Sequence, residues 1–184
     1  EKGILNDPSY PGNYYFAARY YGSADNNFWA IIYGEIFVNM ESFTTRTVET
    51  KNLLYDAYKR LFAFGLEVTK EKKAFEKQAM TLIAKQEAIT TNGITPEVLT
   101  AVRARFILDW YNGAEKQFPF KLFEHQRQLL QEGVFDAYNQ WLFGSVANLS
   151  AFQNWTKTHP EEYVSFNQFQ RNKLFKMPAG QYYQ

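Results

Sequence analysis

The sequence predicts an all-α protein in which antiparallel helix pairs stack side by side. Over most of the chain, apolar residues recur at intervals of three and four, the spacing that lines one face of a helix. Glycine, proline, asparagine and serine interrupt this pattern at regular points, and the gaps between periodic segments are short. No segment shows the sustained two-residue alternation of a β-strand. Short connections place consecutive helices antiparallel, so helix pairs are the expected unit.

The length and composition indicate a single folded core. The chain has 184 residues, of which 46% are hydrophobic and 18% aromatic. A chain of this length buries roughly 70% of its unfolded surface. We therefore expect one all-helical domain over residues 1–184. The clearest break in the pattern follows residue 91, which leaves open a subdivision into residues 1–91 and 92–184.

The first two helices are expected before residue 42. Ser9 and Pro11 indicate a helix start, because proline is favoured in the first helical turn, where its missing N–H is not needed. Gly22 and the serine after it end this helix. Asp25 is expected to cap the second helix, which runs to about Glu41.

The third helix follows the segment SFTTRT (42–47), whose hydroxyl groups suit a helix cap. It is expected to end at Gly65, since glycine is favoured just after a helix. The fourth helix is expected over residues 68–90. The third helix carries an apolar stripe at helical spacing, formed by Leu54, Ala57, Tyr58, Leu61 and Phe62.

The second half of the chain opens with TNGITPEV. Asn92 and Gly93 end one helix, Thr95 caps the next, and Pro96 occupies its first position. Further helices are expected over residues 119–131 and 134–144, and as a pair split at His159 and Pro160 within residues 148–175.

The opening helix pair, residues 11–42, carries a recognisable packing pattern. Tyr14 is followed four residues later by Ala18, then by Tyr21 and, nine residues further on, by Ala30. Small residues let two helices approach closely, and the rings fill the space beside them. This pattern resembles the tetratricopeptide repeat (TPR), and a generic amphipathic helical hairpin is the alternative explanation of the same spacing.

The pattern differs from the family at three positions, two in the second helix and one at Ser42, which stands where the family has a closing proline. Gly34 stands where an aromatic residue is usual, and Phe37 stands where a second alanine is usual. We interpret this as an exchange of large and small side chains. The resemblance implies TPR-like helix pairs over residues 1–91, followed by a C-terminal helical part.

The resemblance also implies a function. TPR-like proteins are non-enzymatic scaffolds that bind a protein or peptide in a groove. Tyr15 and Arg19 lie on the face of the first helix that such repeats turn towards the groove, and an arginine beside a tyrosine suits a carboxylate or a peptide backbone. The alternative for Arg19 is a surface residue packed on a ring.

A second hypothesis is a helical protein that binds a small ligand or a saccharide through exposed rings. The candidate rings are Trp110, Trp141 and Trp155. Each of them lies on or near an apolar stripe, so burial in the core is the favoured interpretation of all three.

The sequence contains no motif that indicates catalysis. It has no cysteine and only two histidines, His125 and His159. Neither has a second histidine three or four residues away, so we expect no zinc or other metal site. No glycine-rich phosphate loop or nucleophile motif occurs, and we expect no cofactor. His125 is expected on a polar helix face, and His159 at a helix end.

Charge and hydropathy exclude two classes of partner. The net charge is +1, with 20 basic and 19 acidic residues, so no field gathers phosphates and nucleic acid is not expected. No run of about 20 apolar residues occurs, so we expect no membrane span. The chain opens on Glu1 with neither a methionine nor a signal peptide. The compartment is therefore unknown, and export after removal of a signal segment stays open.

Overall fold

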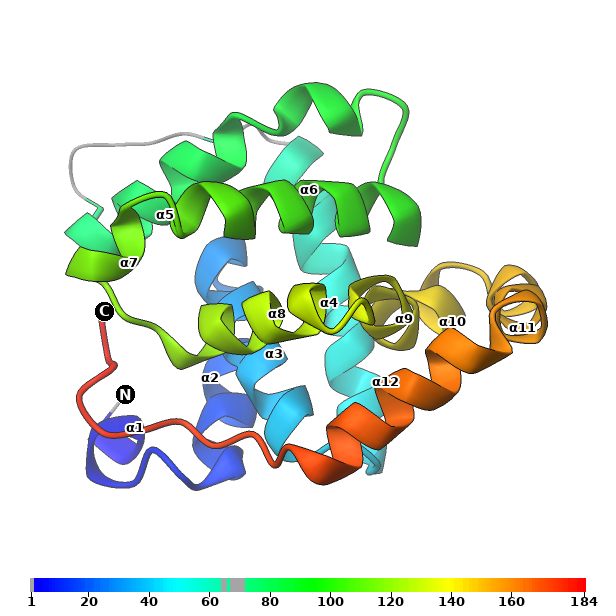
Figure 1. Cartoon of the computed structure of the whole chain (residues 1–184). Coiled ribbons are helices and arrows are strands. Elements are labelled where there is room, and N and C mark those ends of the chain that lie inside the picture. Colours follow the sequence, from blue (N-terminus) through cyan, green and yellow to red (C-terminus); the bar gives the residue numbers. More distant parts are fainter. Residues whose placement is uncertain (1, 64–65, 67–71) are drawn as a thin grey trace.

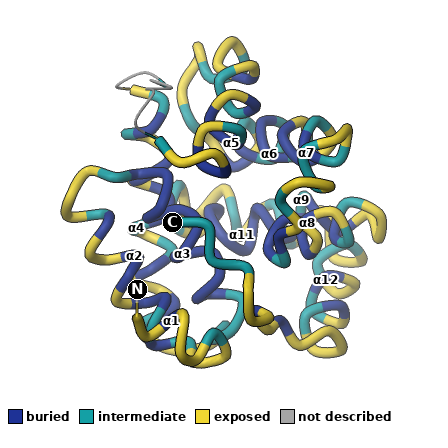
Figure 2. The backbone as a smooth tube through the Cα atoms, turned by 90° about the vertical axis from the view of Figure 1, so that its left-hand side faces the viewer, coloured by how far each residue is buried: buried dark blue, intermediate teal, exposed yellow. Residues whose placement is uncertain are grey.

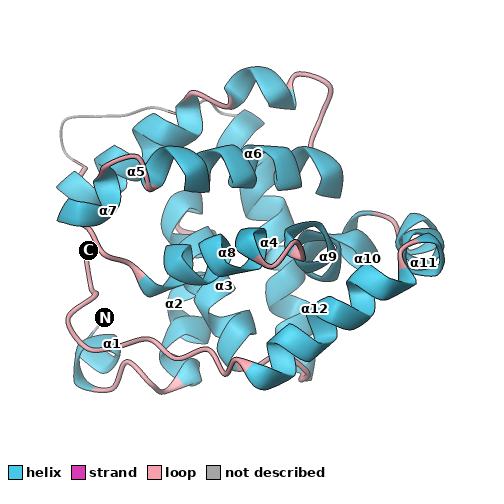
Figure 3. Ribbon diagram, in the orientation of Figure 1, coloured by secondary structure: helices cyan, strands magenta, loops and turns pink. Residues whose placement is uncertain are grey.

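The structure is a computed structural model that describes residues 2–63, 66 and 72–184. Figure 3 shows helices joined by loops, and the described residues include no strand. The predicted all-α class is therefore confirmed, as is the antiparallel packing of consecutive helices. No helix in the described ranges is both long and apolar enough to cross a membrane.

The described helices include those expected from the sequence and two short ones, over residues 2–6 and 114–117, that were not expected. Their bounds are α1 (Lys2–Asn6), α2 (Pro11–Ser23), α3 (Asn27–Met40), α4 (Thr45–Ala63), α5 (Ala74–Ala84), η1 (Glu87–Thr90), α6 (Pro96–Trp110), α7 (Ala114–Gln117), α8 (Lys121–Gln131), α9 (Phe135–Asn139), η2 (Gln140–Gly144), α10 (Ser145–Ala147), α11 (Leu149–Thr158) and α12 (Pro160–Asn172).

Helices α2, α3 and α4 pack side by side, and α8 crosses in front of α3 (Figure 1). Pro11 occupies the first turn of α2, as expected. The predicted cap of α3 is wrong by one residue. The Asn26 side chain accepts a hydrogen bond from the Trp29 N–H at 3.3 Å, whereas Asp25 has a φ of 52° and makes the tight turn. Asparagine serves as a cap for the same reason as aspartate.

Helix α3 is enclosed on all sides, and every residue from Asn27 to Val38 is buried (Figure 2). A helix that is apolar around its whole circumference belongs in the centre of a fold. Its neighbours are α2 and α4 on its flanks and α8 across it. The single charged residue of this helix, Glu35, is therefore carried into the core.

The structure explains the exchange of large and small residues in α3. A Cβ atom added at Gly34 would lie 3.0 Å from the Leu54 side chain and 3.3 Å from Thr50, so glycine lets α4 approach. Phe37 is fully buried, and its ring centroid lies 5.2 Å from that of Tyr15 on α2. Ala18 and Ala30 are also fully buried, as their place in the packing pattern predicts.

The second half of the chain packs around α6, which contacts α5, α8 and α9. The fourth predicted helix is shorter than expected: α5 covers residues 74–84 and the 3₁₀ turn η1 follows. Its expected beginning at residues 68–71, and the predicted helix end at Gly65, lie outside the described residues. The predicted helix over 134–144 contains one π-helical turn, η2.

The C-terminal tail returns to the first helix pair (Figure 1). The Tyr33 hydroxyl donates to Gln184 Oε1 at 2.9 Å, and Gln184 Nε2 donates to the Tyr21 hydroxyl. Phe175 and Met177 of the tail are buried. Side chains of both halves therefore share one buried cluster.

Candidate functional site

Tyr15 and Arg19, the residues selected from the sequence, are in contact with each other. Arg19 Nη1 donates to the Tyr15 hydroxyl at 2.8 Å, and this hydroxyl donates to Glu49 Oε2 on α4 at 2.7 Å. Tyr15 is only 6% exposed, whereas Arg19 is exposed. The guanidinium of Arg46 covers the Tyr15 ring, 5.2 Å from its centroid. Tyr15 therefore joins α2 to α4 and orients Arg19.

Two large rings flank Arg19 on the outside of α2. Phe16 and Tyr20 are each 65% exposed and stand one helical turn apart. We call Phe16, Arg19 and Tyr20 the α2 outer face. The sequence analysis selected only Arg19 from this set, although the i, i+4 spacing of two rings beside it is visible in the sequence.

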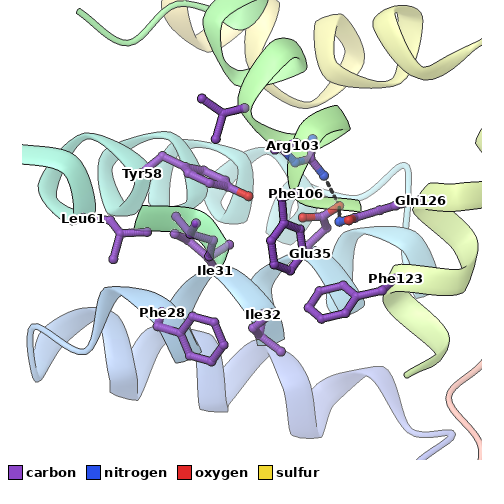
Figure 4. A pocket seen from close by; sticks show the side chains of 12 residues that line it. Phe28, Ile31, Ile32, Glu35, Tyr58, Leu61, Arg103, Phe106, Phe123 and Gln126 are labelled. Atoms are coloured by element: carbon purple, nitrogen blue, oxygen red, sulfur yellow. Dashed lines mark hydrogen bonds and ion pairs between the residues drawn. The ribbon is translucent and has the colours of Figure 1, made fainter. Parts of the chain in front are cut away.

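The core contains a second group of polar side chains, from α3, α6, α8 and α9. We call it the Glu35 cluster, and it consists of Glu35, Arg103, Gln126, Tyr138 and Asn139. Glu35 Oε1 accepts hydrogen bonds from Gln126 Nε2 at 2.6 Å and from the Tyr138 hydroxyl at 2.8 Å. It also pairs with Arg103 Nη2 (Figure 4), while Arg103 Nη1 donates to Asn139 Oδ1.

The Glu35–Arg103 ion pair is almost fully buried, at 1% and 3% exposure. Burial acts to lower the pKa of Arg103, but the adjacent Glu35 carboxylate outweighs it and holds this pKa above its ordinary value. Burial, reinforced by Glu35, raises the pKa of Tyr138. The guanidinium is therefore a fixed positive charge, and the tyrosine a fixed hydrogen-bond donor.

A cavity of about 30 Å³ lies beside this cluster. Glu35, Tyr58, Arg103 and Gln126 form its polar part, and Figure 4 shows the Tyr58 hydroxyl and the Glu35 carboxylate directed towards one another. The remaining walls are apolar and consist of Phe28, Ile31, Ile32, Leu61, Ile83, Val102, Phe106 and Phe123. The space is large enough for one or two water molecules.

The sequence analysis missed this site. The one available signal is a charge within an apolar run, Glu35 in FWAIIYGEIFV and Arg103 in LTAVRARFIL. A charge on a buried stripe requires a partner, because an isolated buried charge is too costly. The two residues are 68 positions apart, so local spacing could not pair them.

The expected position of His125 on a polar face is wrong. His125 is buried, and its ring packs against Phe169 and Phe175 at centroid distances of 5.6 and 5.1 Å. Burial, aided by the positive charges of Lys121 and Lys173, lowers the pKa of His125 to about 4. His125 is therefore neutral near pH 7.

His159 lies at the junction of α11 and α12, as expected, and stacks on Trp155 at 4.7 Å. The expectation that tryptophans belong to the core is met by Trp110 and Trp141, which are buried, and Trp155 is partly buried against the same core. Within the described ranges, no group of three or more His, Cys, Asp or Glu residues is placed to hold a metal ion.

Lys51 on α4 is a partly buried lysine that contacts η2. Its Nζ atom donates to the Trp141 carbonyl oxygen in η2 at 2.8 Å and lies 3.6 Å from the centroid of the Trp141 ring. Burial lowers the pKa of Lys51 to about 7. The amine therefore ties the π-helical turn to α4.

Comparisons with protein-family models, with curated proteins and with solved structures gave no match for this chain.

Proposed function

We propose that this protein is a non-enzymatic, TPR-like interaction module that binds a protein or peptide through the α2 outer face. The observation that carries the proposal is the exposure of Phe16 and Tyr20, at 65% each, beside an arginine held by a buried tyrosine. Contiguous exposed apolar surface is a common mark of an interaction site.

The residue types of this face suit protein recognition. Tyrosine and arginine are enriched among the residues that dominate binding energy at interfaces. Arg19 uses one N–H on the Tyr15 hydroxyl, and a guanidinium has five. The remaining donors suit a carboxylate or a backbone carbonyl of the partner. Because Tyr15 restrains the side chain, Arg19 loses less conformational entropy on binding.

The saccharide hypothesis finds less support. It requires exposed aromatic platforms, and the proposed candidates Trp110 and Trp141 are buried in the core. Catalysis also finds little support in the Glu35 cluster, because its single carboxylate is neutralised by Arg103 and no second carboxylate lines the cavity.

The proposal can be tested by site-specific photo-crosslinking in extracts of the native source. A photoreactive phenylalanine analogue replaces Tyr20 in one protein and Val164 in a control. Val164 lies on α12 and is 53% exposed, which makes it a comparable surface position. We expect one partner to be captured from position 20 and not from position 164.

The captured partner is then measured against Arg19→Ala protein. We expect binding to weaken by about 1–3 kcal/mol, the contribution of a charged hydrogen bond. Capture from both positions alike, or binding that does not respond to Arg19→Ala, would argue against this face as the site.

A further inference from the structure

The cavity beside the Glu35 cluster has hydrogen-bonding groups that remain unused. Glu35 Oε1 receives three donors, whereas no described residue donates to Oε2. The Tyr58 hydroxyl lies within hydrogen-bonding reach of the Arg103 guanidinium, which can only donate, so its own proton has no acceptor among the described residues. It is directed towards the Glu35 carboxylate (Figure 4). Arg103 Nε is buried without a hydrogen-bond partner in the described part of the chain.

From this arrangement we propose that the cavity is a binding site for a hydroxyl group, supplied by water or by a small alcohol. A hydroxyl donates one hydrogen bond and accepts two. The hydroxyl of the ligand can donate to Glu35 Oε2 and accept from the Tyr58 hydroxyl, which has no other acceptor among the described residues. A buried polar group without a partner is costly, so filling the site stabilises the groups that surround it.

Other small polar groups match the site less well. A carboxylate only accepts hydrogen bonds, so it leaves Oε2 without a donor and adds a negative charge beside Glu35. An ammonium only donates, so it cannot accept from Tyr58, and it adds a positive charge beside Arg103. Glu35 and Arg103 already neutralise one another, which favours an uncharged ligand.

The dimensions limit the ligand. A water molecule requires at least about 10–15 Å³ of such space, so a cavity of about 30 Å³ accommodates two waters or one alcohol of two or three heavy atoms. The apolar walls, which include Phe28, Ile32 and Phe123, suit a short alkyl group. Such a small ligand binds in the millimolar range at best.

The probe is ethanol, compared with ethylammonium and acetate, in the wild-type protein. Isoleucine methyl groups are followed by NMR. Ile31, Ile32 and Ile83 line the cavity, whereas Ile4 and Ile107 are buried elsewhere and serve as controls. We expect ethanol to shift the cavity methyl signals saturably and the two ions to shift them little. Cross-relaxation between water and the Ile31 and Ile32 methyls identifies the resident water that ethanol displaces.

A pair of variants tests the chemistry. Tyr58→Phe removes the proposed donor, and Tyr55→Phe on the same helix removes a hydroxyl that bonds to the Ile94 carbonyl instead. We expect Tyr58→Phe to weaken ethanol binding about tenfold, the loss of one hydrogen bond, and Tyr55→Phe to leave it unchanged.

Three results would each overturn the proposal. The first is the absence of both a saturable ethanol shift and a water contact at Ile31 and Ile32. The second is an equal response to ethanol, ethylammonium and acetate. The third is ethanol affinity that is the same in Tyr58→Phe and wild-type protein. The wild-type ligand series decides the matter even where a variant does not fold.

Discussion

Two regions of the molecule combine a carboxylate, a tyrosine and an arginine, at different depths. At the surface, Arg19 donates to Tyr15, which donates to Glu49. In the core, Tyr138 and Arg103 both donate to Glu35. The surface arginine keeps donors available for a partner, whereas the buried one is enclosed by protein. The same residue types therefore form the proposed recognition surface in one place and an internal network in the other.

Burial changes what the loss of one member costs. An exposed charge that loses its partner is solvated by water at little cost. A buried charge that loses its partner remains in a medium of low polarity. We therefore expect substitutions in the buried network to lower stability and substitutions in the surface network to weaken partner binding. The following predictions test this difference, beginning with the largest effect.

The largest effect is expected for Arg103→Met. It leaves the Glu35 carboxylate buried without its counter-charge, so we expect the free energy of unfolding to fall by about 3–5 kcal/mol. Denaturant-induced unfolding measures this value. The double variant Glu35→Leu/Arg103→Met should lose less than Arg103→Met alone, because both charges are then removed. If the double variant is as unstable as Arg103→Met, the unpaired Glu35 charge is not the cause of the lost stability.

The next prediction concerns pH. His125 packs against Tyr138 of the Glu35 cluster, with centroids 6.0 Å apart, and its pKa is lowered to about 4. The unfolded state therefore binds more protons between pH 6.5 and 4, so stability falls as the pH falls through this window. Between the pKa values of the unfolded and the folded state, each pH unit costs roughly 1.4 kcal/mol of stability. The loss of stability should therefore reach up to about 3 kcal/mol at pH 4.

Unfolding measured at a series of pH values checks this effect. His125→Asn should flatten the profile between pH 6.5 and 4, whereas His159→Asn at the exposed junction should leave it as in the wild type. An identical slope in His125→Asn protein would place the acid sensitivity elsewhere.

A third prediction tests the scaffold beneath the α2 outer face. Ala18 is fully buried within the packing of α2, α3 and α4. Ala18→Leu adds three carbon atoms to a filled space, which should lower stability by about 1–3 kcal/mol through overpacking. If Ala18→Leu protein unfolds at the same temperature as the wild type, the interface has space for the larger side chain, contrary to the packing pattern.

The sequence predicts local features of this fold well. Proline in the first turn of α2 and the Thr95–Pro96 start of α6 mark real helix starts, because caps and first turns depend on neighbouring residues. The burial of Ala18 and Ala30 also follows from spacing within one helix pair. Local patterns are sufficient wherever the physical cause lies within a few residues.

Features that depend on distant segments were not predictable. His125 is buried by Phe169 and Phe175, which approach from the C-terminal end of the chain. Glu35 and Arg103 are paired across 68 positions. At the candidate site, Arg19 was predictable from its helix, whereas the bond from Tyr15 to Glu49 required the placement of α4.

The smallest effect on stability is expected for Arg19→Ala. Arg19 is exposed and forms no ion pair in the described part of the structure, and surface substitutions of this kind stay within about 0.5 kcal/mol. Tyr15→Phe is the informative companion, because it retains the ring but removes the hydroxyl that holds Arg19. We expect Tyr15→Phe to cost about 1 kcal/mol of stability, since Glu49 loses a donor.

For partner binding, the order of the two variants is reversed. Arg19→Ala should weaken partner binding more than Tyr15→Phe, because the first removes the donor and the second removes only its orientation. Binding of the partner identified by crosslinking, measured beside denaturant unfolding for both variants, separates the two roles. If Arg19→Ala lowers stability and leaves binding intact, then the surface network has the same structural role as the core network, and depth does not distinguish them.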